Sequence, residues 1–307
     1  MNYTLHQLQI FLKITQLKSI TKASEALFLS QPAVSIQLKK FQDQFSIPLT
    51  EVVGRQLYVT DFGKEIAEAA EKILNEVQAI NYKTLAFKGQ IAGRLKISVV
   101  STGKYVMPYF LSDFTNQNRG VDLVMDVTNK TSVIKSLENN KVDFSLVSVV
   151  PDQLNLNKVE LMENKLYLVG GTKEKFNRRV AKKKIFETYP MLYREEGSAT
   201  RNAMEAYIAS HHIATPKRME LTSNEALKQA VIAGIGYSIM PIIGIKNELK
   251  NGDLQIIPFE DLPIVTTWHL VWHKSKNLSP TAQAYLEFIQ AEKDRIIKES
   301  FDWYQDY

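Results

Sequence analysis

SITKASEALFLSQPAVSIQLKKFQDQF, residues 19–45, contains two short helical patterns joined by a break at Leu29-Ser30. In the second pattern apolar residues recur at spacings of four, three and four, which places them on one buried stripe of a helix: Val34, Leu38, Phe41 and Phe45. Ser30 can cap that helix, and Pro32 suits its first turn, where an amide has no partner. The first pattern starts at Ser19 and carries small alanines on its inner side, so the two helices can cross closely.

A second face of the later helix combines short hydrogen-bonding groups, one exposed apolar side chain and a cation. It holds Gln31, Pro32, Ser35, Ile36 and Lys39, with Ser30 at its start. This mixture suits base edges and phosphates in a DNA major groove. We therefore predict a helix-turn-helix in which these six residues bind DNA. An ordinary helical hairpin with a solvated polar face is the alternative.

The segments on either side complete a small winged domain. Residues 4–17 form an amphipathic helical pattern, so the helix-turn-helix supplies the second and third helices of a bundle. After Phe45, β-branched residues flank a turn at Gly54-Arg55, which predicts a short β-hairpin or wing. Arg55 at its tip is expected to bind DNA through a phosphate or the minor groove, although a solvated arginine would give the same pattern.

Residues 61–88 carry a longer helical pattern. Its apolar residues follow one another at alternating spacings of four and three: Ile66, Ala70, Ile73, Val77, Ile80, Thr84 and Phe87. Such a heptad seam favours pairing with a second copy of the chain. We expect these residues, Thr84 apart, to form a dimer contact that presents two recognition helices to two DNA half-sites. A lone amphipathic helix packed on its own domain would look similar over a shorter distance.

Beyond Gly93, strand-like and helix-like segments alternate. The strands are expected at 95–100, 121–127, 142–147, 166–169, 191–193, 237–240 and 266–272, and the helices near 104–118, 130–139, 199–210, 223–233 and 279–299. This alternation predicts α/β architecture with mainly parallel sheets. A basic cluster at 178–184 is interpreted as a solvated helix edge.

The composition of the 307 residues is that of a globular protein, with 45% hydrophobic and 23% charged residues. The net charge of +5 is compatible with a polyanionic partner. The chain has no cysteine, which excludes disulfides, thiolate metal sites and a cysteine nucleophile. It has no apolar run of the roughly 18 residues that span a membrane and no signal-peptide pattern at its start, so we expect a cytoplasmic protein without a membrane partner.

The motifs of both halves resemble those of the LysR-type bacterial transcriptional regulators. In the first half they are L-x2-L-x2-F ending at Phe11, SITKASEALFLSQPAVS ending at Ser35, IPL ending at Leu49 and GRQLYVTDFG ending at Gly63. In the second half they are KISVVST ending at Thr102, KVDFSLV ending at Val147, EEGSATR ending at Arg201 and NEALKQAVIAGIGYSIMP ending at Pro241.

The resemblance implies three parts: a winged helix-turn-helix DNA-binding domain at 1–60, a linker and dimerisation helix at 61–90, and an effector-binding regulatory domain at 91–307. The regulatory domain would consist of two α/β subdomains shaped like a periplasmic binding protein: subdomain I at about 94–164 and 268–307, and subdomain II at about 165–267. A small-molecule effector would bind between them. The implied partners are double-stranded promoter DNA, the effector and further copies of the chain in a homodimer or homotetramer, with RNA polymerase as a candidate; no cofactor is expected.

The sequence departs from the family pattern at several positions near the expected DNA contact. Ile36 stands where a basic residue is usual, and it could touch a thymine methyl instead. Thr50 and Val52 replace a usual phenylalanine and a phosphate-contacting arginine. Gln42 and Ser46 replace a usual glutamate and glycine. These changes bear on DNA affinity and sequence preference rather than on the fold. The segment ESFDWYQDY, at 299–307, extends past the last family motif and is expected to prolong the last helix, with a contact to a neighbouring subunit as the alternative.

Candidate effector-binding residues lie where strands end and helices begin, because helix amino termini offer unpaired amides to anions. In subdomain I these are Ser101, Thr102, Thr131 and Ser148; in subdomain II they are Ser198, Thr200 and Arg201. Simple helix capping is an equal explanation for Ser101 and Thr102. Arg201 could pair with an anion or make an internal ion pair with Glu195 or Glu196. The arginine and the hydroxyl groups together favour a small anionic effector.

Other functions fit the chain less well. A solute-binding protein would match residues 94–300 but not the 90 residues before them. An enzyme is not expected, because no phosphate-binding glycine loop, G-x-S-x-G motif or metal cluster occurs, and His269 and His273 lie on a strand, roughly 13 Å apart. We therefore predict a sequence-specific DNA-binding transcriptional regulator controlled by a metabolite. An effector-independent dimeric DNA-binding protein is the alternative.

Overall fold

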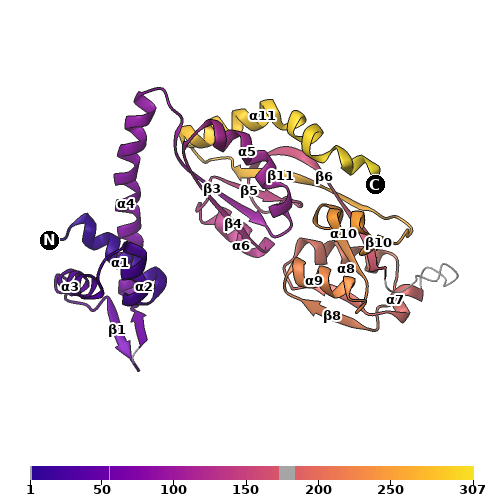
Figure 1. The fold of residues 1–307 in the computed structure, drawn as a ribbon, viewed down its shortest axis with the longest axis horizontal. Coiled ribbons are helices and arrows are strands. Elements are labelled where there is room, and N and C mark those ends of the chain that lie inside the picture. Colours follow the sequence, from indigo (N-terminus) through magenta and orange to yellow (C-terminus); the bar gives the residue numbers. More distant parts are fainter. Residues whose placement is uncertain (1, 55, 173–183) are drawn as a thin grey trace. The chain divides into compact units, whose positions relative to one another are not determined.

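The computed structural model of the chain describes residues 2–54, 56–172 and 184–307. It divides into two compact units, Met1–Gln90 and Ile91–Tyr307, each with its own hydrophobic core (Figure 1). Arg55 and nearly all of the basic cluster at 178–184 lie outside the described residues. Among the described helices, none combines the length and hydrophobicity that a membrane-spanning segment needs.

The amino-terminal unit is a helical bundle with a wing. Its elements are α1 (Leu5–Leu17), α2 (Ile20–Leu27), α3 (Gln31–Gln42), β1 (Thr50–Val53), β2 (Gln56–Val59) and α4 (Asp61–Phe87). Hydroxyl groups start these helices: Thr4, Ser19, Ser30 and Thr60 each accept a hydrogen bond from an amide in the first turn. Lys18 and Phe28 end α1 and α2 in the left-handed region, with φ of 49° and 55°, which makes the turns between helices tight.

The core of this unit forms where α1 packs against α2, α3 and α4. The stripe predicted for α3 is buried at Val34, Leu38 and Phe41, and Phe45 packs beside it. The ring centroid of Phe41 lies 5.1 Å from that of Phe11 and 5.1 Å from that of Phe45. These aromatic contacts fix the recognition helix on the bundle.

The wing is an antiparallel hairpin in which β1 pairs with β2 from Thr50↔Val59 to Val53↔Gln56. Gly54, in its turn, has φ of 58°, a conformation that glycine adopts without strain. At the base of the wing, Gly63 lets α4 pass close to the chain, because a Cβ at this position would lie 2.0 Å from the carbonyl oxygen of Leu49.

The long helix α4 buries only its first part. Ala67 and Ala70 belong to the core of the unit, and Ile66 is half-buried against it. With 1% of its surface exposed, Ala70 has no surface left for a partner, so its prediction as a dimer contact is wrong. The four-three spacing there serves packing within the unit. Further along the helix Ile80 is exposed and Phe87 is 96% exposed.

Strands and helices alternate in the second unit. The strands are β3 (Ala92–Val100), β4 (Gly120–Thr128), β5 (Phe144–Val147), β6 (Leu156–Gly171), β7 (Met191–Arg194), β8 (Arg218–Leu221), β9 (Ser238–Pro241), β10 (Leu254–Ile256) and β11 (Ile264–His273). The α-helices are α5 (Met107–Gln117), α6 (Lys130–Glu138), α7 (Lys184–Thr188), α8 (Ala199–Ser210), α9 (Asn224–Ile232), α10 (Lys246–Asn251) and α11 (Pro280–Phe301). Three short 3-10 helices are described as well: η1 (Gly103–Tyr105), η2 (Ile242–Gly244) and η3 (Asp302–Asp306). The predicted α/β class is confirmed, although β8, β10, α7 and α10 are absent from the prediction.

The large sheet is mixed rather than mainly parallel. Its strand order is β10-β6-β11-β5-β3-β4, and β9 also pairs with β6. β3 is parallel to β4 and β5, whereas β11 is antiparallel to β5 and β6, and β6 is antiparallel to β9 and β10. The prediction of mainly parallel sheets is therefore wrong here. The chain crosses the unit along β6 and returns along β11, and two such strands form an antiparallel pair.

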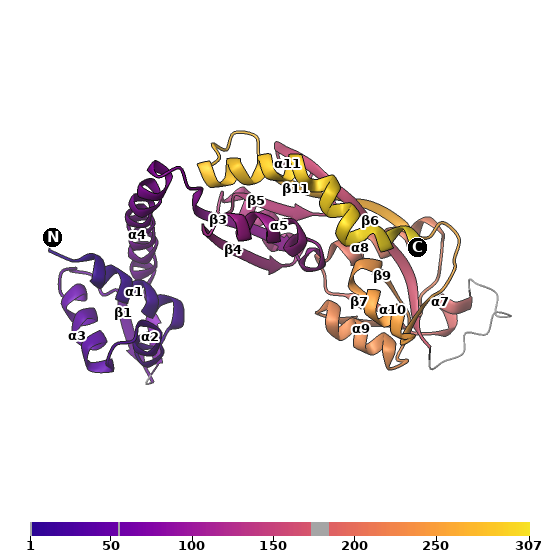
Figure 2. The same cartoon turned by 45° about the horizontal axis from the view of Figure 1, so that its top comes forward.

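The two long strands join subdomain I to subdomain II. Subdomain I holds β3, β4 and β5, with α5 and α11 packed together beside them (Figure 2). Subdomain II has a core of its own around Phe186, Tyr193 and Ile208, and the small parallel sheet of β7 and β8. The loops after β3, β4 and β5 in subdomain I and the start of α8 in subdomain II carry the candidate effector residues.

Candidate DNA-binding surface and effector cleft

Helix α3 presents the predicted DNA-binding residues on its outer side. Ser30 caps the helix, since its hydroxyl accepts a hydrogen bond from the amide of Ala33. Gln31, Pro32, Ile36 and Lys39 are exposed, as is Ser30, and Ser35 is half-buried. The opposite side of α3 carries the buried stripe, so the helix turns away from the bundle a face of polar residues interrupted by the exposed Ile36. Arg55, the predicted wing contact, lies outside the described residues.

Two departures from the family pattern contact each other. The hydroxyl of Thr50, at the start of β1, donates a hydrogen bond to the side-chain oxygen of Gln42, at the end of α3. The pair ties the recognition helix to the wing through two polar side chains. The two residues that differ from the family pattern therefore form a contact with each other.

An exposed aromatic side chain, absent from the predicted DNA contacts, lies in the turn before α3. Phe28 is 94% exposed and has left-handed backbone geometry. Its sequence position, within an apolar run, gives no sign of this exposure. It extends the surface around the amino-terminal end of α3 by one large apolar group.

Ser101 is one point where the two subdomains meet through hydrogen bonds. It follows β3 in subdomain I. Its hydroxyl oxygen accepts hydrogen bonds from two side chains of subdomain II: Asn224 Nδ2 at 3.2 Å and Arg194 Nη2 at 3.4 Å. A candidate residue predicted from one subdomain thus faces two donors of the other.

Arg194, at the end of β7, is the most deeply buried cation near this contact, with 3% of its surface exposed. Its Nε and Nη2 atoms donate to the two carboxylate oxygens of Glu195 at 2.8 and 2.7 Å, and its Nη1 atom donates to the side-chain oxygen of Asn224. The bidentate pair holds the guanidinium in one orientation. The donors that reach Ser101 are therefore fixed before a ligand arrives.

A second cross-cleft approach lies at Gly197, in the loop before α8. A Cβ at this glycine would lie 2.7 Å from the hydroxyl oxygen of Thr131, which opens α6 in subdomain I. Gly197 also has φ of 81°. Next to it, Ser198 starts α8 without making a capping hydrogen bond in the described structure, unlike Ser223 at the start of α9. The first amides of α8 are thus available to an anion.

Most of the remaining predicted hydroxyl residues are buried in the two subdomains. β3 and β5 are parallel, with Val99 opposite Leu146. Ser101 and Ser148 each follow two residues later along these strands, so they lie next to each other at the same edge of the sheet. Thr102, Ser148, Ser198 and Thr200 are buried. A groove of about 680 Å³ is lined from subdomain I by Lys130 and Val149 and from subdomain II mainly by α8, so it includes chain neighbours of the predicted effector residues but none of those residues themselves.

Arg201 does not point a free guanidinium toward an effector. Its Nε donates to Glu205 at 3.0 Å, and its Nη1 donates to Glu220 at 2.7 Å and to the carbonyl oxygen of Arg194. Burial lowers the pKa of Arg201, but these two carboxylates outweigh it and raise the pKa above the ordinary value. The internal ion pair is therefore present, with Glu205 and Glu220 rather than with the expected Glu195 or Glu196. Two carboxylates already bind the donors of this guanidinium, and a role of Arg201 as an effector ligand stays a prediction.

The sequence pattern missed Arg194 and Asn224. Arg194 precedes the EEGSATR motif and reads as the last residue of a buried strand, while Asn224 reads as the first residue of a helix. Neither position signals a contact with Ser101, which is 93 and 123 residues away. Only the fold brings them together.

No group of three or more potential metal ligands occurs among the described residues. His269 and His273 contact different backbone carbonyls, those of Thr267 and Leu137. The two imidazoles therefore have separate structural partners.

Comparison with known proteins gives two adjoining family matches. Residues 5–64 match the bacterial regulatory helix-turn-helix protein of the lysR family, and residues 88–294 match the LysR substrate binding domain. The HTH-type transcriptional activator CmpR of Synechocystis sp. is 32% identical over 299 residues, covering 96% of this chain and 97% of CmpR.

Solved structures agree with these matches. The Synechocystis PCC6803 CcmR regulatory domain in complex with 2-PG is 28% identical, covers 66% of this chain and 97% of its own, and has a TM-score of 0.61. Full-length CbnR complexed with its target DNA covers 94% of this chain and 99% of its own with a TM-score of 0.69; at 18% identity it supports the fold alone.

The two family matches follow one another along nearly the whole sequence and correspond to the helical unit and the α/β unit of the fold. Proteins of this family regulate transcription and are not enzymes. The chain belongs to the LysR family: it is a DNA-binding transcriptional regulator with a regulatory domain for a small-molecule effector.

Proposed function

We propose that the chain acts as a homodimer, and in a tetramer of two dimers, on double-stranded promoter DNA in the cytoplasm. The exposed part of α4 supports the dimer, because Ile73, Ile80 and Phe87 leave apolar surface along one helix. The exposed face of α3 would contact the DNA, together with Arg55, which lies between β1 and β2 in the sequence. Promoter binding would bring the regulator close to RNA polymerase as a further partner.

We also propose that a small anion binds between the subdomains at Ser101, Thr102, Thr131 and Ser148 on one side and at Ser198 and Thr200 on the other. The observation that carries this proposal is the convergence of Arg194 and Asn224 on one hydroxyl oxygen across the cleft. An anionic oxygen accepts hydrogen bonds from such donors more strongly than a neutral hydroxyl does. The free amides at the start of α8 would add further donors.

The effector would act by bridging the subdomains. At 3.2 and 3.4 Å, the direct hydrogen bonds to Ser101 lie at and just beyond the upper end of the usual range, so an inserted oxygen atom can replace them with shorter ones. A ligand that contacts both sides binds the closed form better than the open form, and this difference in affinity shifts the population toward closure. Closure would then change how the assembly holds its DNA half-sites.

Calorimetric titration of the full chain with 2-PG, the compound in the CcmR complex, tests this proposal. Ser101→Ala removes the central hydroxyl and should weaken binding roughly 10- to 100-fold, the value of one hydrogen bond to a charged group. Ser112→Ala, which changes an exposed serine on α5, is the matched control and should bind as the parent does.

The alternative outcome has a clear meaning. If neither 2-PG nor inorganic phosphate nor a panel of small carboxylates binds the parent chain, an anionic effector is ruled out for this cleft. An effector-independent dimeric DNA-binding protein would then be the better description, provided that specific DNA binding is still observed. A solute-binding protein would not account for the helix-turn-helix match at residues 5–64.

A further inference from the structure

The segment that follows the last family-matched residue contacts both subdomains. The match ends at residue 294, but α11 continues to Phe301 and the chain then forms η3, Asp302–Asp306. Figures 1 and 2 show α11 lying along the large sheet, with its carboxy-terminal end near β6. This segment is rich in aromatic residues, and its contacts fall into three groups.

The first group holds the segment to subdomain I. Phe301 is buried, and its ring centroid lies 5.0 Å from that of Tyr109 and 6.0 Å from that of Phe110, both on α5. Nearly two turns earlier in α11, Arg295 pairs with Asp113 of α5 at 2.7 Å. This end of α11 is therefore fixed to α5 by packing and by charge.

The second group reaches subdomain II. The ammonium group of Lys246, the first residue of α10, lies 4.5 Å from the centroid of the Trp303 ring. A cation over an indole face is the most favourable form of this interaction. Trp303 also packs edge-on against Tyr304, at 5.2 Å between ring centroids. The segment thus carries a direct contact from one subdomain to the other.

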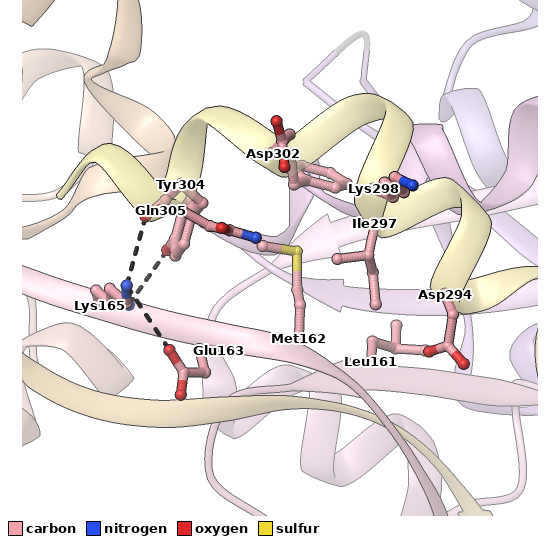
Figure 3. A pocket seen from close by; sticks show the side chains of 11 residues that line it. Leu161, Met162, Glu163, Lys165, Asp294, Ile297, Lys298, Asp302, Tyr304 and Gln305 are labelled. Atoms are coloured by element: carbon pink, nitrogen blue, oxygen red, sulfur yellow. Dashed lines mark hydrogen bonds and ion pairs between the residues drawn. The ribbon is translucent and has the colours of Figure 1, made fainter.

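The third group lies where β6 passes between the subdomains. Lys165 donates its backbone amide to the hydroxyl of Tyr304 at 3.2 Å, and its ammonium group donates to the carbonyl oxygens of Tyr304 and Tyr307 at 3.4 and 3.1 Å. The ring of Tyr304 is buried. Figure 3 shows Lys165 directed from β6 toward the end of the segment. One lysine of the connecting strand therefore holds two residues of the segment.

We propose that residues 302–307 form a strap across the connection between the subdomains, which restrains opening of the effector cleft. Opening requires β6 and β11 to bend where they pass from one subdomain to the other. The strap follows directly on Phe301, which packs on α5, and it contacts α10 through Trp303 and Lys165 through Tyr304 and Tyr307, so bending must break or stretch at least one of these contacts. The inference rests on the proposed opening and closing of the cleft.

The strap depends on a small number of contacts. A pocket of about 480 Å³, lined on its apolar side by residues such as Leu161, Met162 and Ile297, lies between β6 and the end of α11 (Figure 3). The end of α11 is therefore not packed continuously onto the strand beneath it. Removal of the contact between Trp303 and Lys246 should consequently be enough to release the strap from subdomain II without unfolding the sheet.

Distances between spin labels can test the strap without DNA or effector. Because the chain has no cysteine, Lys135→Cys on α6 and Gln229→Cys on α9 place one label on each subdomain, at exposed positions. Mixing the labelled chain with an excess of the cysteine-free parent suppresses distances between copies. The test variants are a deletion of 302–307 and Trp303→Ala. Arg295→Ala is the matched control, because it removes charge contacts of α11 that stay within subdomain I.

We expect one narrow distance distribution in the parent and in the Arg295→Ala variant. The deletion and Trp303→Ala should shift the distribution to longer distances and broaden it. If the deleted chain does not fold, Trp303→Ala and Lys246→Met provide the test, because each removes one side of the same contact. The two variants should then shift the distance distribution by the same amount. An unchanged distribution in Trp303→Ala and Lys246→Met, or in a folded deletion, would overturn the proposal. This result would leave effector binding untouched, since the titration with 2-PG is a separate measurement.

Discussion

Replacing Arg194 by methionine perturbs the charge network behind the cleft. The arginine is buried and donates two hydrogen bonds to the Glu195 carboxylate. Removal of one partner of a buried ion pair costs about 3–5 kcal/mol, because the other charge is left without compensation. The side chain of Glu195 is 18% exposed and can be partly rehydrated, so we expect the free energy of unfolding of the second unit to fall by about 3 kcal/mol, the low end of that range.

Urea unfolding followed by tryptophan fluorescence measures this unit alone, because Trp268, Trp272 and Trp303 all belong to it. Adding Glu195→Gln to Arg194→Met should recover part of the loss, since the unpaired carboxylate is replaced by a neutral amide. The double-mutant cycle then gives the coupling between the two side chains. A loss below about 1 kcal/mol in Arg194→Met, the value typical of an exposed pair, would refute the buried network.

Four further changes follow from the structure. Phe28→Asn should stabilise the amino-terminal unit by about 1 kcal/mol in thermal unfolding followed by circular dichroism, because asparagine tolerates left-handed geometry better and an exposed ring loses no packing; an unchanged or lower midpoint would contradict this. Phe41→Ala should destabilise the same unit by about 3–5 kcal/mol in the same assay, since its ring fills the core, and a loss of less than about 1 kcal/mol would mean that the core closes around the gap. Arg201→Met should change the free energy of unfolding in urea by no more than about 1 kcal/mol, because the carboxylate partners of Arg201 are partly exposed. It should also leave 2-PG binding intact, because the guanidinium pairs with these carboxylates; loss of binding would show that Arg201 contacts the effector. The hydrogen bond to Asp261 raises the pKa of His211. The stabilisation that His211 provides is therefore complete below its ordinary pKa of 6.5 and is lost as the pH rises through the raised pKa. His211→Gln should lower the urea midpoint more at about pH 5 than at about pH 9, and an equal effect at the two pH values would argue against this charge contact.

Local patterns predicted the helices of the amino-terminal unit well. The stripe of α3 and the capping residue Ser30 depend on neighbours within the same helix, so spacing alone identifies them. The same logic failed at Ala70. A four-three repeat indicates one buried face, but it does not say whether the covering surface belongs to the same unit or to a second copy.

Strand direction was not accessible from periodicity. Alternation of strands and helices is typical of parallel sheets, but β6 and β11 cross between subdomains and pair antiparallel. Their role as connections depends on how the subdomains are linked, which no window of sequence records. Short elements such as α10 also lack enough residues to show a period.

In the candidate cleft, too, local sequence patterns predicted some features and not the contacts that depend on the fold. Hydroxyl residues at strand ends were found because the order of strands and helices in the chain indicates where loops meet. The partners of charged side chains were not found, because Arg194 and Arg201 lie seven residues apart and differ only in which carboxylates the fold brings to them. The contact between Thr50 and Gln42 is hidden for the same reason, since each position alone reads as a loss of a family residue.

A gel-shift titration of the full chain on the DNA upstream of its own gene tests the central claim most directly. It should be done at roughly 0.15 M salt with excess unrelated competitor, because non-specific phosphate contacts weaken steeply with salt. The account predicts a discrete complex that survives the competitor and is lost when Gln31 and Ser35 on α3 are both replaced by alanine. A salt-sensitive smear on this DNA and on a wider genomic pool, unaffected by those two changes, would contradict sequence-specific regulation by this chain.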